Sequence, residues 1–124
     1  MQIETLGVHY ILDLCSCNVT LLNNSAHIMS SLKEAILKSN ATLLEELKYE
    51  FTPQGVTAIC LLSESHISIH TWPEKQYAAV DIFTCGDHTQ PAKACEYMIN
   101  ALESKKPNMT IITRGIWFLA VSAP

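Results

Sequence analysis

Long hydrophobic runs are missing from this sequence. Its apolar stretches, such as residues 116–121, are far shorter than the roughly 20 residues that a membrane-spanning helix needs. The first residues, Met1 to Glu4, lack the basic segment, apolar stretch and cleavage site of a secretory signal. We therefore expect a soluble, cytoplasmic protein that does not contact a membrane.

Positive charge is also scarce. Eight Lys and Arg face twelve Asp and Glu, which gives a formal net charge of -4, and Lys105-Lys106 is the only adjacent basic pair. Nucleic-acid binding relies on clustered positive charge. The sequence therefore predicts no nucleic-acid partner, whereas a small cationic substrate fits an acidic protein better.

The cysteines form no regular framework. Their number is odd, and they stand at positions 15, 17, 60, 85 and 95 without a Cys-x-x-Cys pair. In a reducing compartment they should be thiols, and we expect all except Cys85 to be small buried residues.

The sequence also lacks a complete set of metal ligands. On one strand His66 and His70 would stand about 13 Å apart, too far to share an ion. The run from Cys85 to His88 offers ligands locally, but no second close pair completes a tetrahedral site. We expect no metal.

The periodicity of what is present predicts an α+β fold. The 124 residues, 48% of them hydrophobic, fit a single domain over 1–124. Alternating patterns predict strands at 7–14, 42–51, 56–62, 65–71, 77–84, 109–113 and 116–121, and helical spacing predicts helices at 26–39 and 92–104. We expect a two-layer sandwich: a mainly antiparallel sheet with two helices on one face.

Two neighbouring segments carry the chemistry. The run SESHISIHTWPE spans residues 63–74, and AAVDIFTCGDH spans residues 78–88. Together they resemble the signature of bacterial and archaeal S-adenosylmethionine decarboxylases, because they join a self-cleavage element, a histidine element and a Thr-Cys-Gly element. The order of predicted strands and helices agrees with that family over nearly the whole chain.

This resemblance implies that the chain cuts itself between Glu64 and Ser65. In the family, the serine hydroxyl attacks the preceding carbonyl, an ester replaces the amide, and β-elimination leaves a dehydroalanine that hydrolyses to a pyruvoyl group. Residues 1–64 would become the β chain and residues 65–124 the α chain. Because Ser65 supplies the pyruvoyl group, no external cofactor is implied.

The same resemblance assigns roles to two more side chains. A substrate amine can condense with the ketone to a Schiff base, which accepts the electron pair released as carbon dioxide leaves. Cys85 resembles the proton donor, and thiols are mostly protonated at neutral pH. His70 matches the histidine that accepts a proton during processing.

Four further positions complete the implied site. Thr57 stands where the family commonly has a serine that supports processing, and its methyl group restricts the rotamers of the hydroxyl. Phe51 would stack on adenine, and Glu74 would bind the ribose hydroxyls. Trp72 either faces the positively charged sulfonium or belongs to the core.

The geometry of an extended strand leads us to expect a dimer. If residues 65 to 70 form one extended strand, Ser65 and His70 lie roughly 16 Å apart on opposite faces. We therefore hypothesise a homodimer of αβ units with composite sites. Each site would take Ser65 and Cys85 from one protomer and Thr57, His70, Phe51 and Glu74 from the other.

The sequence thus predicts a decarboxylase that makes decarboxylated S-adenosylmethionine for spermidine synthesis. One alternative keeps the pyruvoyl chemistry but acts on an amino acid such as ornithine or arginine. Another is an uncleaved regulatory partner of an active decarboxylase, although such a role requires none of Ser65, His70 and Cys85.

Overall fold

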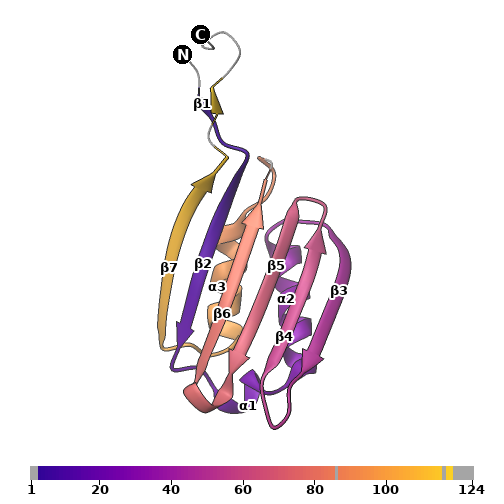
Figure 1. Cartoon of the computed structure of the whole chain (residues 1–124), viewed down its shortest axis with the longest axis vertical. Coiled ribbons are helices and arrows are strands. Elements are labelled where there is room, and N and C mark those ends of the chain that lie inside the picture. The colour runs from indigo at the N-terminus through magenta and orange to yellow at the C-terminus, as the bar shows by residue number, and fades with distance from the viewer. Residues whose placement is uncertain (1–2, 86, 116, 119–124) are drawn as a thin grey trace.

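A computed structural model describes residues 3–85, 87–115 and 117–118. It has two layers, a six-stranded antiparallel sheet and a layer of helices that covers one of its faces (Figure 1). The strand order is β3-β4-β5-β6-β2-β7, and a separate two-stranded ribbon pairs β1 with β8. The α+β sandwich that the sequence predicts is confirmed.

The strands of the large sheet follow the alternation of the sequence. Their bounds are β2 Gly7–Cys15, β3 Leu43–Glu50, β4 Val56–Leu62, β5 Ser65–Trp72, β6 Tyr77–Thr84 and β7 Lys106–Arg114. The ribbon consists of β1 Ile3–Glu4 and β8 Trp117–Phe118. Of the strand expected over 116–121, the pair 117–118 is observed as β8, and the other residues lie outside those described.

Two helices of more than ten residues each pack against one face of the sheet. Helix α2 spans Ser25–Lys38 and begins at Asn24, whose side chain accepts a hydrogen bond from the His27 backbone N–H at 3.0 Å. Helix α3 spans Pro91–Ala101, with its proline in the first turn, where the missing N–H costs no hydrogen bond. A short helix α1, Val19–Leu22, was not predicted from the sequence patterns. A 3-10 turn η1, Pro73–Lys75, forms at the connection that was expected between the strands now seen as β5 and β6.

The core lies between the sheet and the helices. Every second residue of the central strands faces it, as in β5, where Ile67 and Ile69 are almost fully buried. Most of the other buried apolar residues come from β2, β4 and β6 and from one face each of α2 and α3, for example Leu12, Val56, Val80, Leu32 and Met98.

The opposite face of the sheet is not covered by any described helix. Figure 1 views the molecule from this side, with α2 and α3 behind the strands. Large apolar side chains are exposed on it: the register places Leu47 of β3 beside Ile59 of β4, and their exposed fractions are 71% and 40%. We call this surface the open face.

The strand expected over residues 42–51 is observed, whereas the burial expected for Cys15 is not. The segment 42–51 contains the helix-favouring run Leu-Glu-Glu-Leu, yet it forms edge strand β3, because pairing with β4 outweighs local propensity. Cys15 was expected to be buried but is exposed, since it ends β2 on the side opposite the buried Leu14. No described helix is both long and apolar enough to cross a bilayer.

Candidate active site

The carbonyl oxygen of Glu64 receives two hydrogen bonds from one residue. Glu64 lies in the turn between β4 and β5, immediately before Ser65, and Cys85 follows the end of β6. The backbone N–H of Cys85 donates to this oxygen at 3.0 Å and its thiol donates at 3.1 Å. The two donors withdraw electrons from the Glu64 carbonyl, which makes its carbon a better electrophile.

The side chain of Glu64 is buried and ionised. Its Oε2 lies 2.7 Å from Nε2 of His88, and its Oε1 accepts a hydrogen bond from the backbone N–H of Thr42 at 3.0 Å. These two bonds, that of His88 first, lower the pKa of the carboxyl from 4.5 to about 2. The backbone of His88 is held as well, because its carbonyl accepts from the side chain of Asn40. Glu64 therefore ties the turn before Ser65 to the segment that carries Cys85.

The ionised carboxylate of Glu64 should make the free energy of unfolding depend on pH. Because its pKa is lower in the folded chain than in the unfolded one, the stabilisation is complete above pH 4.5 and is lost as the pH falls toward 2. In a Ser65→Ala background, which keeps the chain intact, we expect Glu64→Gln to lower the free energy of unfolding at pH 7. At pH 3 the gap between the two proteins should shrink by an amount on the order of 1 to 2 kcal/mol. Urea unfolding at both pH values measures this, and an unchanged gap would contradict it.

Ser65 has an unusual backbone conformation. It begins β5 with φ of 149°, a value that L-residues rarely adopt and that costs on the order of 1 to 3 kcal/mol. Its Oγ lies 3.4 Å from Nδ1 of the next residue, His66. Strain is therefore located at the residue whose preceding carbonyl is polarised. We call the group of Glu64, Ser65, His66, Cys85 and His88 the Ser65 end.

A second cluster lies at the other end of the same strands. Thr57 of β4 stands opposite His70 of β5, and Thr57 Oγ1 lies 2.8 Å from His70 Nδ1. In the tautomer with Nδ1 protonated, this N–H donates to Thr57, and Nε2 is left as a proton acceptor. The ring of Trp72 lies 6.3 Å from that of His70.

Aromatic side chains continue this second cluster. Trp72 also lies 5.5 Å from the ring of Tyr77, and Tyr49, which is paired with Thr57, lies 4.8 Å from the ring of Phe51. Phe51 and Trp72 are 51% and 40% exposed, so Trp72 is not a core residue. Glu74 follows within the turn η1. We call this cluster the His70 end.

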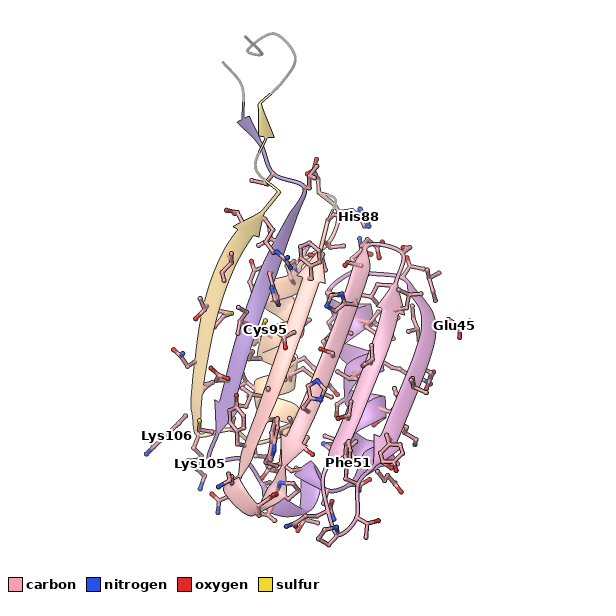
Figure 2. All side chains as sticks on the ribbon, viewed as in Figure 1. Glu45, Phe51, His88, Cys95, Lys105 and Lys106 are labelled. Atoms are coloured by element: carbon pink, nitrogen blue, oxygen red, sulfur yellow. The ribbon has the colours of Figure 1, made fainter. Side chains whose placement is uncertain are left out.

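The structure separates the two ends within one chain. It brings Glu64, Ser65 and Cys85 together, and separately it brings Thr57, His70 and Trp72 together. Figure 2 labels His88 near one end of the sheet and Phe51 near the other. Because residues 65 to 72 form one strand, Ser65 and His70 are about 16 Å apart along it.

Cys85 differs from three of the other cysteines in its exposure to solvent. Burial is the main cause that raises the pKa of Cys60 and of Cys95 to about 11, and the pKa of the buried Cys17 is raised for the same reason. Cys85, in contrast, is exposed. Of the four cysteines expected to be inert core residues, these three are buried.

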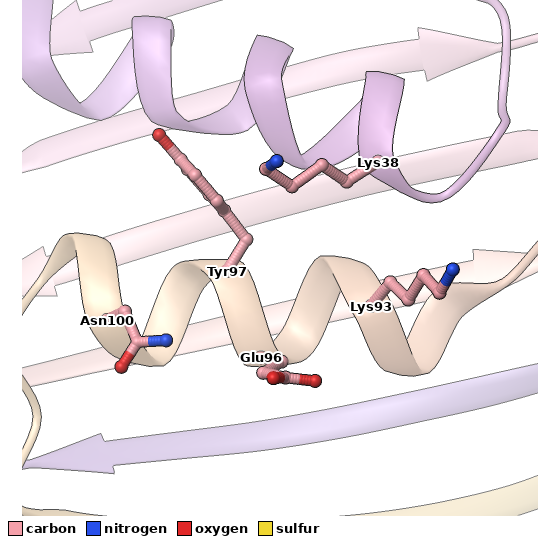
Figure 3. A pocket seen from close by; sticks show the side chains of 5 residues that line it. All are labelled: Lys38, Lys93, Glu96, Tyr97 and Asn100. Carbon is pink, nitrogen blue, oxygen red and sulfur yellow. The ribbon is translucent and has the colours of Figure 1, made fainter.

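One groove on the helix side of the molecule belongs to neither end. A shallow groove of about 420 Å³ lies between α2 and α3, where Lys38 Nζ stands 5.7 Å from the centre of the Tyr97 ring (Figure 3). The other residues that line it are Lys93, Glu96 and Asn100. None of the five is a predicted site residue, and the groove lies in the helix layer, on the other side of the sheet from the open face.

Sequence reasoning missed the contributions of His66 and His88. Both were weighed only as metal ligands. Among the described residues, no three His, Cys, Asp or Glu side chains come together around a common point. The available signal was position, since His66 directly follows Ser65, the predicted cleavage residue, and His88 stands three residues after Cys85.

The fold and the two clusters define the class of protein. It is an α+β enzyme with a two-layer sandwich whose reactive groups lie on and around one sheet. Residues 8–115 match the family model of S-adenosylmethionine decarboxylase. The chain belongs to this family.

Individual relatives agree over most of their length. A protein of Prochlorococcus marinus (strain MIT 9211), named S-adenosylmethionine decarboxylase proenzyme, is 49% identical over 109 residues, which cover 88% of this chain and 89% of that protein. A protein of the same name from Clostridium tetani (strain Massachusetts / E88) is 42% identical over 114 residues, 92% of this chain and 90% of that one. The crystal structure of the adenosylmethionine decarboxylase from Aquifex aeolicus has a TM-score of 0.87 at 35% identity and covers 98% of both chains.

Proposed function

We propose that this chain cleaves itself between Glu64 and Ser65 and then decarboxylates S-adenosyl-L-methionine. The product would be S-adenosylmethioninamine, the aminopropyl donor for spermidine synthesis. Family membership supports the decarboxylation. The single observation that supports self-cleavage is the pair of hydrogen bonds from Cys85 to the Glu64 carbonyl oxygen.

That pair of donors suits the first step of cleavage. When Ser65 Oγ adds to the Glu64 carbonyl carbon, negative charge develops on the carbonyl oxygen. Donors at 3.0 and 3.1 Å are close enough to stabilise this charge, and one such donor typically contributes about 10²- to 10³-fold in rate. The positive φ of Ser65 adds strain that cutting the peptide bond releases.

The residues at Ser65 also fit the group that cleavage would produce. A pyruvoyl group at this position takes up the electron pair that is released when carbon dioxide leaves the substrate. The Cys85 thiol already lies beside the backbone at this point, so it can deliver the proton that replaces the carboxyl group. Its exposure allows substrate to reach it.

The His70 end would serve the second step of processing and the binding of substrate. His70, oriented by Thr57, would accept the proton whose loss drives elimination of the ester. Phe51 and Trp72 offer exposed aromatic faces for adenine and the sulfonium, and Glu74 offers a carboxylate for the ribose hydroxyls.

A homodimer would bring the two ends together. The separation of about 16 Å would keep His70 from reaching Ser65 in its own chain, whereas a second copy turned end for end on the open face would bring its His70 end over the partner's Ser65 end. Exposed apolar residues on the open face, such as Leu47, Ile59 and Leu61, support this packing, because burying them in a dimer removes them from water.

Intact mass measurement and product analysis test the proposal. Purified wild-type protein should give two chains, 1–64 and 65–124, the second beginning with a pyruvoyl group. Incubation with S-adenosylmethionine, ornithine or arginine should yield a decarboxylated product from the first alone. A single chain that persists after long incubation would contradict the catalytic proposal and favour a regulatory role.

A further inference from the structure

His66 is the imidazole in contact with the hydroxyl that the proposed cleavage must activate. Its Nδ1 lies 3.4 Å from Ser65 Oγ. In the tautomer that carries its proton on Nε2, Nδ1 can accept a hydrogen bond from this hydroxyl. Catalytic hydrogen bonds are often this long before the reacting groups close up.

Two other titratable side chains beside the Glu64–Ser65 bond already have hydrogen-bond partners. The carboxylate of Glu64 is bound by His88 and by the Thr42 backbone N–H, and its low pKa makes it a weak base. The Cys85 thiol donates its hydrogen to the Glu64 carbonyl oxygen. In these arrangements neither group can take a proton from Ser65.

The remaining histidines of the open face have partners of their own. His70 lies about 16 Å along β5 from Ser65 and is bonded to Thr57. His9 belongs to β2, on the far side of β6, and its Nε2 lies 2.9 Å from Asp81. His66 is thus the histidine placed to act on Ser65 from within the same chain.

We infer that His66 is the general base of the first step of self-cleavage, before the ester exists. This inference rests on the proposed function. It divides the processing between two histidines, with His66 of the same chain forming the ester and His70 of the partner chain eliminating it.

The step balances with the groups present. His66 Nδ1 takes the proton of Ser65 Oγ as this oxygen bonds to the Glu64 carbonyl carbon, and the carbonyl electron pair moves onto the oxygen that Cys85 contacts. When the carbonyl re-forms, the carbon–nitrogen bond breaks, and the proton passes from His66 to the Ser65 nitrogen. The products are an ester and a free amine, and no oxidant or further reactant is needed.

Hydroxylamine separates the two steps, because it cuts an ester at neutral pH but leaves an ordinary amide intact. The chain contains no Asn-Gly pair, the peptide bond that hydroxylamine also attacks. We expect His66→Asn to slow cleavage by about 10²-fold or more and to leave a full-length chain that resists hydroxylamine. His70→Asn should also remain full length, but hydroxylamine should cut it between residues 64 and 65.

His9→Asn is a matched control. His9 and His66 stand opposite Phe83 on its two sides, with ring distances of 5.9 and 6.0 Å and nearly equal tilts, but only His66 contacts Ser65. The His9 variant should cleave at close to the wild-type rate. Equal slowing of both variants would show that His66 acts through packing and would overturn the inference.

A second background tests the chemistry of the base. In Ser65→Cys the nucleophile is a thiol, which ionises far more readily than a hydroxyl. Replacing His66 should therefore slow formation of the hydroxylamine-sensitive thioester much less than it slows the serine chain, whereas a purely structural defect would slow both equally. The inference is overturned if His66→Asn cleaves normally or accumulates an ester. If the wild-type chain and the His70 variant both stay intact and resist hydroxylamine, the proposed function itself fails.

Discussion

Ser65→Ala should leave the chain uncut and without decarboxylase activity. Alanine has no hydroxyl to attack the Glu64 carbonyl, so neither the ester nor the pyruvoyl group can form. Because the ketone is the electron acceptor of the proposed reaction, activity should fall to the uncatalysed background, a loss of at least roughly 10⁶-fold. Intact mass and release of carbon dioxide from S-adenosylmethionine measure the two effects.

Ser68→Ala is the matched control for this variant. Ser68 lies on the same strand, three residues further on, and stands opposite Asp81, away from the Glu64 carbonyl. Its loss should leave both cleavage and decarboxylation close to wild type. A cleaved and active Ser65→Ala protein would remove the basis of the proposed mechanism.

Mixing two inactive variants should restore cleavage in one of them. In a dimer of Ser65→Ala with His70→Ala, one composite site carries both substitutions and the other carries neither. The intact site contains Ser65 of the His70→Ala chain, so this chain should be cut. With equal amounts and random pairing, about half of the His70→Ala chains should be cleaved, against none when that variant is made alone.

A small mass tag on one variant identifies the chain that is cut. Cleavage should occur only in the chain with His70→Ala, and only when the two variants are made together. Joint production of Ser65→Ala with Cys85→Ala is the control, since both substitutions affect the same half of the site and no dimer then contains a complete site. The Cys85→Ala chain should therefore be cut no faster in the mixture than when it is made alone. If His70 acted within its own chain, mixing would restore nothing.

Most of the fold could be predicted from the sequence because its strands alternate and its helices are amphipathic. The bounds of β4 and β6 agree with the pattern to the residue, and β5 is one residue longer. The pattern could not predict α1 or the 3-10 form of the turn η1, because single turns have too few residues to show a period. It also missed the exposure of Cys15, because burial at the end of a strand depends on the neighbouring elements.

The candidate site was likewise predicted only in part from the sequence. The motifs predicted Glu64, Ser65 and Cys85 as site residues, and the structure brings these three together. The strand predicted from Ser65 onward forms as one continuous strand that keeps Ser65 and His70 far apart. The contacts of Glu64 with His88 and Thr42 join residues more than 20 positions apart in the sequence. Such contacts arise from the packing of the turn after β4 against the segment after β6, so no local spacing in the sequence indicates them.

The position of Glu64 and Ser65 between two paired strands affects what the proposed cut leaves behind. Strands β2, β3 and β4 would belong to one product, and β5, β6 and β7 to the other, with β2 lying between β6 and β7. The two polypeptides would be interlaced, so they could part only by breaking three strand interfaces of the large sheet and the pairing of β1 with β8. Refolding, however, would become an encounter of two molecules, slower on dilution. The mature enzyme would then resemble a split protein, assembled once as a single chain and held afterwards by kinetic stability.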